Sequence, residues 1–528
     1  MSLRTEVCMN YAEVKRNIWS NSISNYIRTV VGMAVGLLTF RMLYQALNKE
    51  QFGFWSLLWS VFGYGILLDF GFGFAAQKRV AELSVKQDWA KLSRVLSTIL
   101  FFYTGVAVFI ALIVLVGSTH IVGWFGVSPQ NAEEFRRILV VFFVGIGIAF
   151  PMGIFPEILR GQQRIRLVNN LISAALVLRL GLIACAVWYK WSFMAVMFIA
   201  LVFALIPDCL AALLALRWMP AVRLSPRLFS PALMRETMSF SIFAYLGTAT
   251  NIVLGKTDQL VLGATLSISA VALYQAGAKI AEVFSQFTRQ VQDTLSPAAA
   301  HLHAIGDRAA LSDLLVNSMR WSVLIATPLY LLCAFYLDEL LQLLTGDRLI
   351  ARETYLVGQV LLLWFYTTIL THSVSKRIFM MCGHERRLLW LGLGEAIANL
   401  ALSVTLVLIF RNVAAVAVGS LIPTLYFGWV HLWPWMAREA GMRGWQLFSR
   451  TVLPSWAACV PMLVVLVAFQ FVTLAPGGKA VVAMFIESAI AGLVALVGLW
   501  RIALNVNERE QLAVKFFAKF PRLRKQPV

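Results

Sequence analysis

The sequence has few charged residues and no long polar segment. Only 13% of its 528 residues are charged, whereas 60% are hydrophobic, and the mean hydropathy is +0.76. A soluble globular domain has about 25% charged and roughly 45–50% apolar residues. The apolar character extends from about Ile18 to Leu504, so no polar stretch is long enough to hold a soluble domain. The composition therefore excludes a soluble protein with a single membrane anchor.

Cysteines and catalytic motifs are also scarce. The six cysteines stand singly without C-x-x-C spacing, so we expect neither a disulfide framework nor a metal site. The chain has no G-x-S-x-G, Walker or H-E-x-x-H motif. The first residues lack the short apolar core and small-residue cleavage site of a secretory signal, so the first apolar segment is expected to be retained. We predict that the protein is not an enzyme and has no cofactor.

Turn signals and charge clusters divide the apolar sequence into segments about as long as a membrane is thick. A spanning helix needs about 20 mostly apolar residues, because each residue adds 1.5 Å across a hydrocarbon core of roughly 30 Å. The expected fold class is therefore all-α integral membrane, with about fourteen transmembrane helices. They are expected near residues 18–46, 52–77, 95–117, 137–158, 168–189, 193–216, 239–265, 270–297, 319–341, 354–380, 388–410, 412–436, 452–474 and 480–501.

The distribution of Lys and Arg between alternate loops predicts the orientation. With the N-terminus inside, 32 of the 45 basic residues lie in inside segments and 8 lie in outside segments. Positive residues stay on the cytoplasmic side of a membrane. We therefore expect a multi-pass membrane protein with both termini in the cytoplasm and no nucleic-acid partner. The basic tail 504–528 could contact anionic membrane lipids or remain solvated.

After the loop residues are assigned, five basic residues remain within the predicted spans, and six acidic residues are set against them. Each costs roughly 2.5–3.5 kcal/mol at a helix centre unless it has a partner or faces an aqueous cavity. Matching depths on neighbouring spans suggest that some of them neutralise one another. The candidate pairs are Arg28 with Asp69, Arg179 with Asp208, and Lys279 with Asp258 or Glu282. The charges without an obvious partner are Arg41, Glu395 and Glu487, and Lys256 is the remaining basic residue.

The order of segments repeats along the chain. The first two spans and the seventh and eighth spans each consist of an apolar helix, a short turn, a second apolar helix and a polar exit. Two six-span halves with the site at their interface are a recurring transporter plan. We predict an N-terminal lobe over 1–218, a cytoplasmic inter-lobe loop over 219–238, a C-terminal lobe over 239–437, two extra spans within 438–503 and a basic cytoplasmic tail over 504–528.

Two segments carry a set of motifs in a characteristic order. Leu37–Leu83 contains Arg41 at the end of a span, Phe52-Gly53 after a short turn, the D-x-G step Asp69-Phe70-Gly71, and the exit Lys78-Arg79 with Glu82. Lys256–Ile280 contains Asp258, Leu262-Gly263 and Tyr274, where the matching pattern has D, L-G and Y. Together these motifs resemble the bacterial polysaccharide transporters, the flippases for lipid-linked oligosaccharides of the O-antigen type. The resemblance covers the chain through about Arg438, with Ala272 and Glu395 as departures from the usual pattern.

The resemblance implies the fold of the multidrug/oligosaccharidyl-lipid/polysaccharide exporter superfamily, abbreviated MOP. Two six-helix pseudo-symmetric lobes would surround a central cavity that opens alternately to each side, with two further C-terminal helices. The implied substrate is a polyprenyl-diphosphate-linked oligosaccharide, moved to the outer leaflet of the bacterial inner membrane for cell-surface polysaccharide or exopolysaccharide synthesis. Polysaccharide polymerase or export machinery is an implied partner.

The implied substrate assigns roles to the charged residues. A diphosphate that crosses a medium of low dielectric constant requires cationic contacts. The candidates for this contact are Arg28, Arg41, Lys256 and Lys279. The candidates for binding a coupling H⁺ or Na⁺, or for gating, are Asp69, Asp258 and Glu282.

Two other functions remain open at this point. The first is a cation-coupled multidrug antiporter of the same superfamily, which would require a cavity dominated by unpaired carboxylates. Asp69 and Asp258 are consistent with this function. A membrane glycan polymerase or ligase requires catalytic residues in sizeable outside loops, whereas the predicted outside loops are mostly under about 20 residues by the span lengths above. The pattern therefore favours a flippase.

Overall fold

The computed structural model describes residues 11–292, 299, 302–303, 306–471, 480–506 and 508–510, and every regular element in these ranges is a helix. The chain forms two compact units. The first unit comprises Met1–Gln275, Leu344–Gly346 and Gly392–Val416, and the second comprises Ala276–Leu343, Asp347–Leu391 and Ala417–Val528. The units group helices by contact, and the predicted lobe boundaries stay a prediction.

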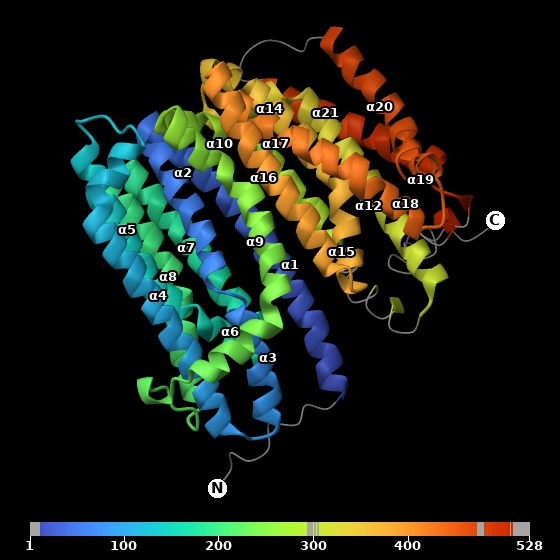
Figure 1. Ribbon diagram of the computed structural model, residues 1–528. Coiled ribbons are helices and arrows are strands. Elements are labelled where there is room, and N and C mark those ends of the chain that lie inside the picture. The colour runs from blue at the N-terminus through green and yellow to red at the C-terminus, as the bar shows by residue number, and fades with distance from the viewer. Residues whose placement is uncertain are drawn as a thin grey trace, which may run out of the picture. The chain divides into compact units, whose positions relative to one another are not determined.

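The first unit contains the six N-terminal spans and three later helices (Figure 1). Its elements are α1 (Tyr11–Ala46), α2 (Lys49–Tyr64), η1 (Gly65–Leu68), α3 (Phe72–Val85), α4 (Trp89–Trp124), α5 (Ala132–Met152), α6 (Ile154–Gly161), α7 (Ile165–Trp188), α8 (Phe193–Trp218), η2 (Pro226–Leu228), α9 (Pro231–Thr265), the start of α10 (Ile268–Gln292) and most of α16 (Glu385–Phe410).

The second unit contains the remainder of α10 and the C-terminal helices. Its other elements are α12 (Arg308–Phe335), α13 (Leu337–Thr345), α14 (Arg348–Thr368), η3 (Ile369–Ser373), α15 (Val374–Met381), α17 (Val413–Tyr426), η4 (Phe427–Leu432), α18 (Trp433–Glu439), α19 (Gly444–Thr451), α20 (Leu453–Phe471), α21 (Ala480–Gly498) and η5 (Leu499–Ala503). The segments η3, η4 and η5 are π-helical, so each interrupts or ends an α-helix with a wider turn.

Eleven of the fourteen predicted spans correspond to helices that can cross a membrane. Among the described residues, ten helices are long and apolar enough, or eleven if the bent pair α19–α20 is one span. The other three predicted spans fall in α2–α3, α9 and α10, so the count of fourteen stays a prediction. These three hold the intramembrane charges Asp69, Lys256, Asp258, Lys279 and Glu282.

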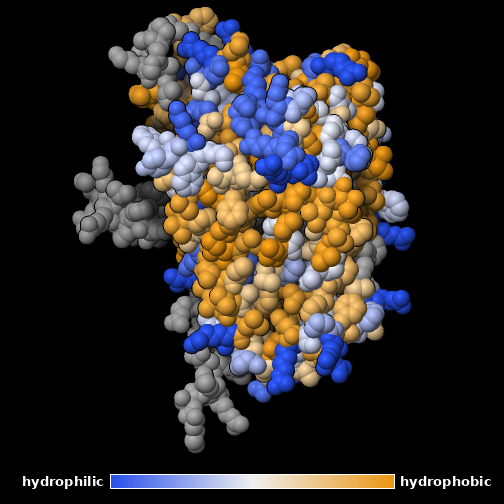
Figure 2. Space-filling view, turned by 90° about the vertical axis from the view of Figure 1, so that its left-hand side faces the viewer, coloured by the Kyte–Doolittle hydropathy of each residue, from blue (hydrophilic) through white to orange (hydrophobic). Residues whose placement is uncertain are grey.

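The surface of the protein is suited to a bilayer. Figure 2 shows a broad band of hydrophobic residues across one face, with hydrophilic residues above and below it. Large apolar side chains that a soluble protein would bury are exposed on α4, where Phe109 is 64% and Val116 is 84% exposed. Such side chains are stable in contact with hydrocarbon. The chain is therefore a multi-pass membrane protein.

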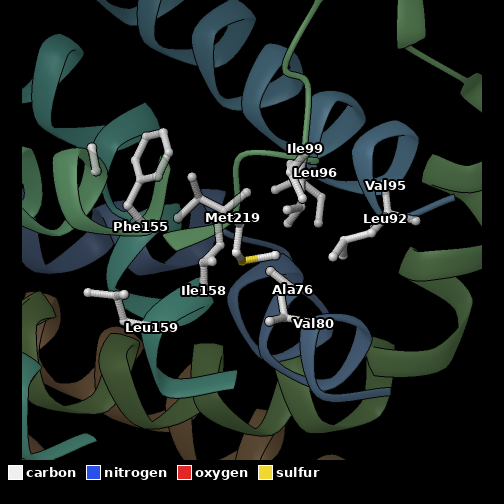
Figure 3. Packing of buried hydrophobic residues seen from close by; sticks show 14 of the residues in the cluster. Ala76, Val80, Leu92, Val95, Leu96, Ile99, Phe155, Ile158, Leu159 and Met219 are labelled. Carbon is white, nitrogen blue, oxygen red and sulfur yellow. The ribbon is translucent and has the colours of Figure 1, made fainter. Parts of the chain in front are cut away.

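A buried core joins the short helices of the first unit. Ala76 and Val80 of α3, Leu92–Ile99 of α4 and Ile158 of α6 pack around Met219 (Figure 3). At Gly161 the backbones of α6 and α3 meet so closely that an added Cβ would lie 2.7 Å from the carbonyl oxygen of Gln77. This contact requires glycine and holds α3 beside α6, immediately below the cavity described next.

Candidate functional site

Two of the predicted spans of the first unit are broken within their length. The second span ends its first half at Tyr64, continues as the short 3₁₀ turn η1, and restarts as α3 after Phe70 and Gly71, which have positive φ angles of 49° and 77°. The fourth span is divided between α5 and α6 at Gly153, two residues after Pro151. Non-helical backbone at membrane depth is tolerated only where it is buried in protein or lines a cavity.

Asp69 stabilises the break in the second span. Its carboxylate accepts a hydrogen bond from the backbone N–H of Gly73 at 3.0 Å, and its carbonyl oxygen accepts one from Phe72 at 2.9 Å. The carboxylate therefore caps the N-terminus of α3, where the helix dipole favours negative charge. The hydroxyl of Tyr103, a residue of α4 that is only 3% exposed, donates a hydrogen bond to the same carboxylate.

A cavity of about 310 Å³ opens beside these breaks, entirely within the first unit. Its walls come from the second span, α4, the fourth span and α8. The polar and titratable side chains that line it are Trp59, Asp69, Tyr103, Glu157 and Asp208. Five glycines, Gly63, Gly65, Gly73, Gly145 and Gly153, also line it and leave the space open. The polar walls and the broken helices coincide, as in transporter sites built from discontinuous helices.

The three carboxylates in the cavity have different partners. Glu157 forms an ion pair with Arg160 on the same short helix. Asp69 and Glu157 both face Gly73, because a Cβ added there would lie 3.5 Å from side-chain atoms of each residue. Asp208 follows Pro207 within α8 and has no hydrogen-bond partner among the residues that the structure describes. A buried carboxylate without a fixed partner is able to take up a proton or a cation.

Helix α9 packs against α2, which supplies part of the cavity wall. The hydroxyls of Tyr64 on α2 and Thr257 on α9 are hydrogen-bonded at 2.8 Å. The next residue before Thr257, Lys256, lies against Gly63, with its Cε 3.7 Å from the position of an added Cβ. Gly63 lines the cavity, whereas Lys256 is not among the lining residues. The neighbouring Asp258 is 5% exposed and accepts a hydrogen bond from Tyr274.

Residues 18–303 identify the family to which the chain belongs. This range, more than half of the chain, matches the sequence model of the family described as "Polysaccharide biosynthesis protein". The chain belongs to this family. A curated relative, the membrane protein MJ1068 of Methanocaldococcus jannaschii, is 28% identical over 122 residues. That match spans 23% of this chain and 24% of the relative's length, so the chain aligns with only about a quarter of it.

The chain has the fold of MOP superfamily transporters. The lipid II flippase MurJ in an inward closed conformation superposes with a TM-score of 0.71 over 95% of this chain and 99% of that one, at 12% identity. An inward-facing multidrug resistance MATE family transporter gives 0.64 over 80% and 98%, at 14% identity. A MOP superfamily transporter from Pyrococcus furiosus gives 0.56 over 80% and 95%, at 15% identity. At these identities the similarity shows the fold alone.

The remaining predicted site residues lie outside the cavity lining. Arg28 lies on α1, one turn after a contact with α7. In that contact Asn169 of α7 donates hydrogen bonds to Ser24 at 2.9 Å and to Asn25 at 2.7 Å, both on α1. The guanidinium Nε of Arg28 is buried, with no hydrogen-bond partner among the described residues. Arg41 lies near the other end of α1, beside the turn into α2.

Of the predicted ion pairs, the structure contains the local one. Lys279 and Glu282 of α10 form an ion pair at 3.7 Å. The predicted pairs Arg28–Asp69 and Arg179–Asp208 are wrong: Asp69 is bonded to Tyr103 and Gly73, and Asp208 lines the cavity. Depth along a helix gives the height of a side chain but not the direction in which it points, and both predictions rested on depth.

Sequence reasoning gave no site role to four polar or titratable residues of the cavity, Trp59, Tyr103, Glu157 and Asp208. Tyr103 was part of an uncharged apolar span, and Glu157 was placed at the end of the fourth span beside Arg160 and received no role. A signal for Glu157 was present, because Pro151, Gly153 and Pro156 surround it in the sequence and predict a break in the helix. A carboxylate at such a break is expected to line a cavity.

Proposed function

We propose that this protein is a flippase that moves a polyprenyl-diphosphate-linked oligosaccharide from the cytoplasmic to the outer leaflet by alternating access. The membership in a polysaccharide biosynthesis family and the fold shared with a lipid flippase support this proposal. In this proposal the protein resides in the bacterial inner membrane with both termini in the cytoplasm, supplies cell-surface polysaccharide synthesis, and performs no chemical step of its own.

The observation that carries the proposal is that two basic residues on predicted membrane spans have no anionic partner in the part of the chain that the structure describes. Arg28 and Lys256 have no ion-pair partner among the residues that the structure describes. A cation at membrane depth is costly unless an anion or water compensates it. The diphosphate of the lipid-linked sugar is a suitable anion, because Arg and Lys bind phosphate oxygens through charge-assisted hydrogen bonds.

The other charged residues complete the proposal. Arg41 and Lys279 are further candidate contacts for the diphosphate, with the charge of Lys279 shared with Glu282. Asp69, Asp258 and Glu282 are candidates for coupling or gating by H⁺ or Na⁺. The position of Asp69 in a cavity with Glu157 and Asp208 favours Asp69 most, since a cation there would meet more than one carboxylate.

Binding of the substrate by purified protein tests the proposal. Full-length protein in lipid nanodiscs is titrated with a fluorescent polyprenyl-diphosphate oligosaccharide. We expect Arg28→Ala and Lys256→Ala to weaken binding by about tenfold or more, in line with roughly 1.5–3 kcal/mol for a hydrogen bond to a charged group. Lys91→Ala, which removes an exposed cation at the start of α4, is the matched control and should bind normally. Unchanged affinity in both test variants would contradict the assignment.

The carboxylates of the cavity favour a second candidate function. A cation-coupled multidrug antiporter of the same superfamily needs carboxylates able to bind a cationic drug, and Asp208 lacks a partner among the described residues. Ethidium efflux from cells that express the protein separates the two functions. Efflux that depends on Asp208 supports the antiporter, whereas binding of the lipid-linked sugar without efflux supports the flippase.

A further inference from the structure

The second unit has a cavity of about 470 Å³ between α12, α14 and α20. One face of each helix lines it, because the lining residues recur at spacings of three, four and seven, as Trp456, Cys459, Val460 and Leu463 do on α20. Three of the apolar lining residues, Leu363, Val460 and Leu463, are 44–54% exposed. The cavity therefore opens on the outer surface of the protein.

The surface around the opening is suited to hydrocarbon. The helices α14 and α20 belong to spans long and apolar enough to cross a membrane, and apolar side chains such as Leu356 and Val464 are exposed on them beside the opening. Water in a cavity requires two to four polar partners, and apolar cavities stay dry. Because this lining is mainly apolar and the opening faces the membrane, we expect a hydrocarbon chain to fill the cavity.

One end of the cavity is polar and adjoins α19. The Tyr366 hydroxyl is hydrogen-bonded to Thr327 at 2.9 Å and accepts a hydrogen bond from the indole N–H of Trp456 at 2.8 Å. Trp456 lies in the first turn of α20, and its ring meets that of Phe448 on α19 edge to face, with 5.4 Å between the ring centroids. The polar end of the cavity is therefore the end nearest α19.

Helix α19 has the composition of a helix at a membrane–water interface. Its Leu447 is fully buried, whereas Trp445 is 69% exposed and stacks on Phe448. Arg443, at the N-terminus of the helix, and Arg450, in its last turn, are both exposed. Tryptophan beside exposed basic residues is typical of segments at the level of the lipid headgroups. The bend of 42° between α19 and α20 marks the point where the chain enters the span.

We propose that this cavity and α19 together bind a phospholipid of net negative charge from the surrounding bilayer. One hydrocarbon chain occupies the cavity, and the phosphate group lies at Arg450, in the turn of α19 next to α20. Arginine binds phosphate oxygens through charge-assisted hydrogen bonds, and Arg443 adds a second positive charge at the same helix. The inference goes beyond the proposed function, because the ligand is a lipid of the bilayer and not the cargo.

Photo-crosslinking of the full-length protein in lipid nanodiscs tests the inference. The nanodiscs consist of phosphatidylcholine with a small fraction of phosphatidylglycerol that carries a diazirine in one acyl chain, and labelled peptides are identified by mass spectrometry. We expect labelling on the cavity faces of α12, α14 and α20. Arg450→Gln should reduce this labelling about fivefold, the effect of one basic residue beside an anionic lipid surface. Arg386→Gln, which removes an exposed cation at the start of α16, is the matched control and should label normally.

A second variant tests the cavity itself. Ala334 is exposed and lines the cavity, so Ala334→Phe places a ring where the chain would lie, and labelling should fall at least fivefold. Equal labelling by phosphatidylcholine with the same diazirine, or labelling that persists in either variant, would overturn the inference. Displacement of the label by a polyprenyl diphosphate, at concentrations where unlabelled phosphatidylglycerol has no effect, would assign the cavity to the cargo and also overturn it. Because the probe is not the cargo, loss of the inference leaves the flippase proposal unaffected.

Discussion

Each unit of the protein has a cavity, and the two cavities differ in the charged groups of their linings. The cavity in the first unit carries three carboxylates and a tyrosine. The cavity in the second unit, about 470 Å³, lies between α12, α14 and α20 and is lined mainly by Leu, Val, Ala and aromatic side chains. Three of its polar groups bond to one another: the Tyr366 hydroxyl is hydrogen-bonded to Thr327 at 2.9 Å and to Trp456 at 2.8 Å.

The difference in charged groups between the two linings follows from whether the helices that form each cavity are interrupted there. The helices of the second unit continue as α-helix past their cavity, although Pro328 lies within α12 and Pro461 within α20, so most of their backbone groups are satisfied internally and the lining needs no charge. The second and fourth spans of the first unit are interrupted at the cavity, which frees backbone donors and acceptors. Asp69 satisfies one of those groups, the backbone N–H of Gly73, and places a carboxylate in the cavity. Placing a charge in one cavity and removing charges from the other tests this account.

The largest effect is expected from a charge in the apolar cavity. Cys459 lines this cavity and is 1% exposed. Cys459→Asp buries a carboxylate among apolar groups, so we expect it to lower the free energy of unfolding by about 3 kcal/mol or to prevent folding. Thermal unfolding in detergent measures the change. Cys459→Val, similar in size, is the control and should cost less than about 1.5 kcal/mol. Equal stability of Cys459→Asp and wild type would refute the distinction.

The next largest effect is expected at Asp69. Asp69→Ala removes the cap of α3 and leaves the buried hydroxyl of Tyr103 without its acceptor. Losing a cap costs about 1 kcal/mol and an unsatisfied buried hydroxyl about 1–3 kcal/mol, so we expect a loss of about 2–3 kcal/mol.

Asp69→Asn keeps an acceptor at the same position and serves as the control. It should lose only about 1 kcal/mol, because neutral hydrogen bonds replace charge-assisted ones. Denaturant or thermal unfolding in detergent distinguishes the two variants. If both variants were equally stable, Asp69 would not act as a cap.

A smaller loss is expected where α3 and α6 meet. An added methyl group at Gly161 would lie 2.7 Å from the Gln77 carbonyl oxygen, so Gly161→Ala should cost about 1–3 kcal/mol through forced separation of the two helices. Gly181→Ala on α7 has open space around the new methyl group and is the control. It should be neutral or stabilising by up to about 1 kcal/mol. The same thermal unfolding assay compares them, and equal effects would contradict the packing.

The smallest effect on stability is expected at Asp208. Because this carboxylate has no hydrogen-bond partner among the described residues, Asp208→Asn should leave the free energy of unfolding unchanged or raise it by up to about 1 kcal/mol. Transport should nevertheless fall at least tenfold if the cavity binds a coupling cation. A variant that unfolds earlier than wild type would show instead that Asp208 is structural.

The fold was predictable from the sequence where the signal is local. Apolar segments of about 20 residues located eleven spans, and Lys279 with Glu282 was identified because residues three apart share one helix face. The D-x-G step at Asp69 marked one wall of the cavity. Pairs between helices were not predictable, as Arg179 and Asp208 show, because the rotation of each helix is set by packing.

The features that depend on packing between helices were also hidden in the sequence. The π-turns at η3 and η4 have no composition that distinguishes them, and the contact of Gly428 with Thr371 joins segments more than fifty residues apart. Tyr103 gave no signal, because its role depends on the carboxylate that α3 presents to it. Sequence reasoning located the charges, and the structure showed which of them share a cavity.

Translocation in proteoliposomes is the most direct test of the central claim. A fluorescent polyprenyl-diphosphate oligosaccharide is placed in vesicles containing the protein, and a quencher outside reports which leaflet it occupies. The account predicts that wild type and Lys91→Ala equilibrate the lipid across the bilayer, whereas Arg28→Ala and Lys256→Ala slow it by at least tenfold. Equal rates in all four proteins, or no translocation by the wild type, would contradict the account.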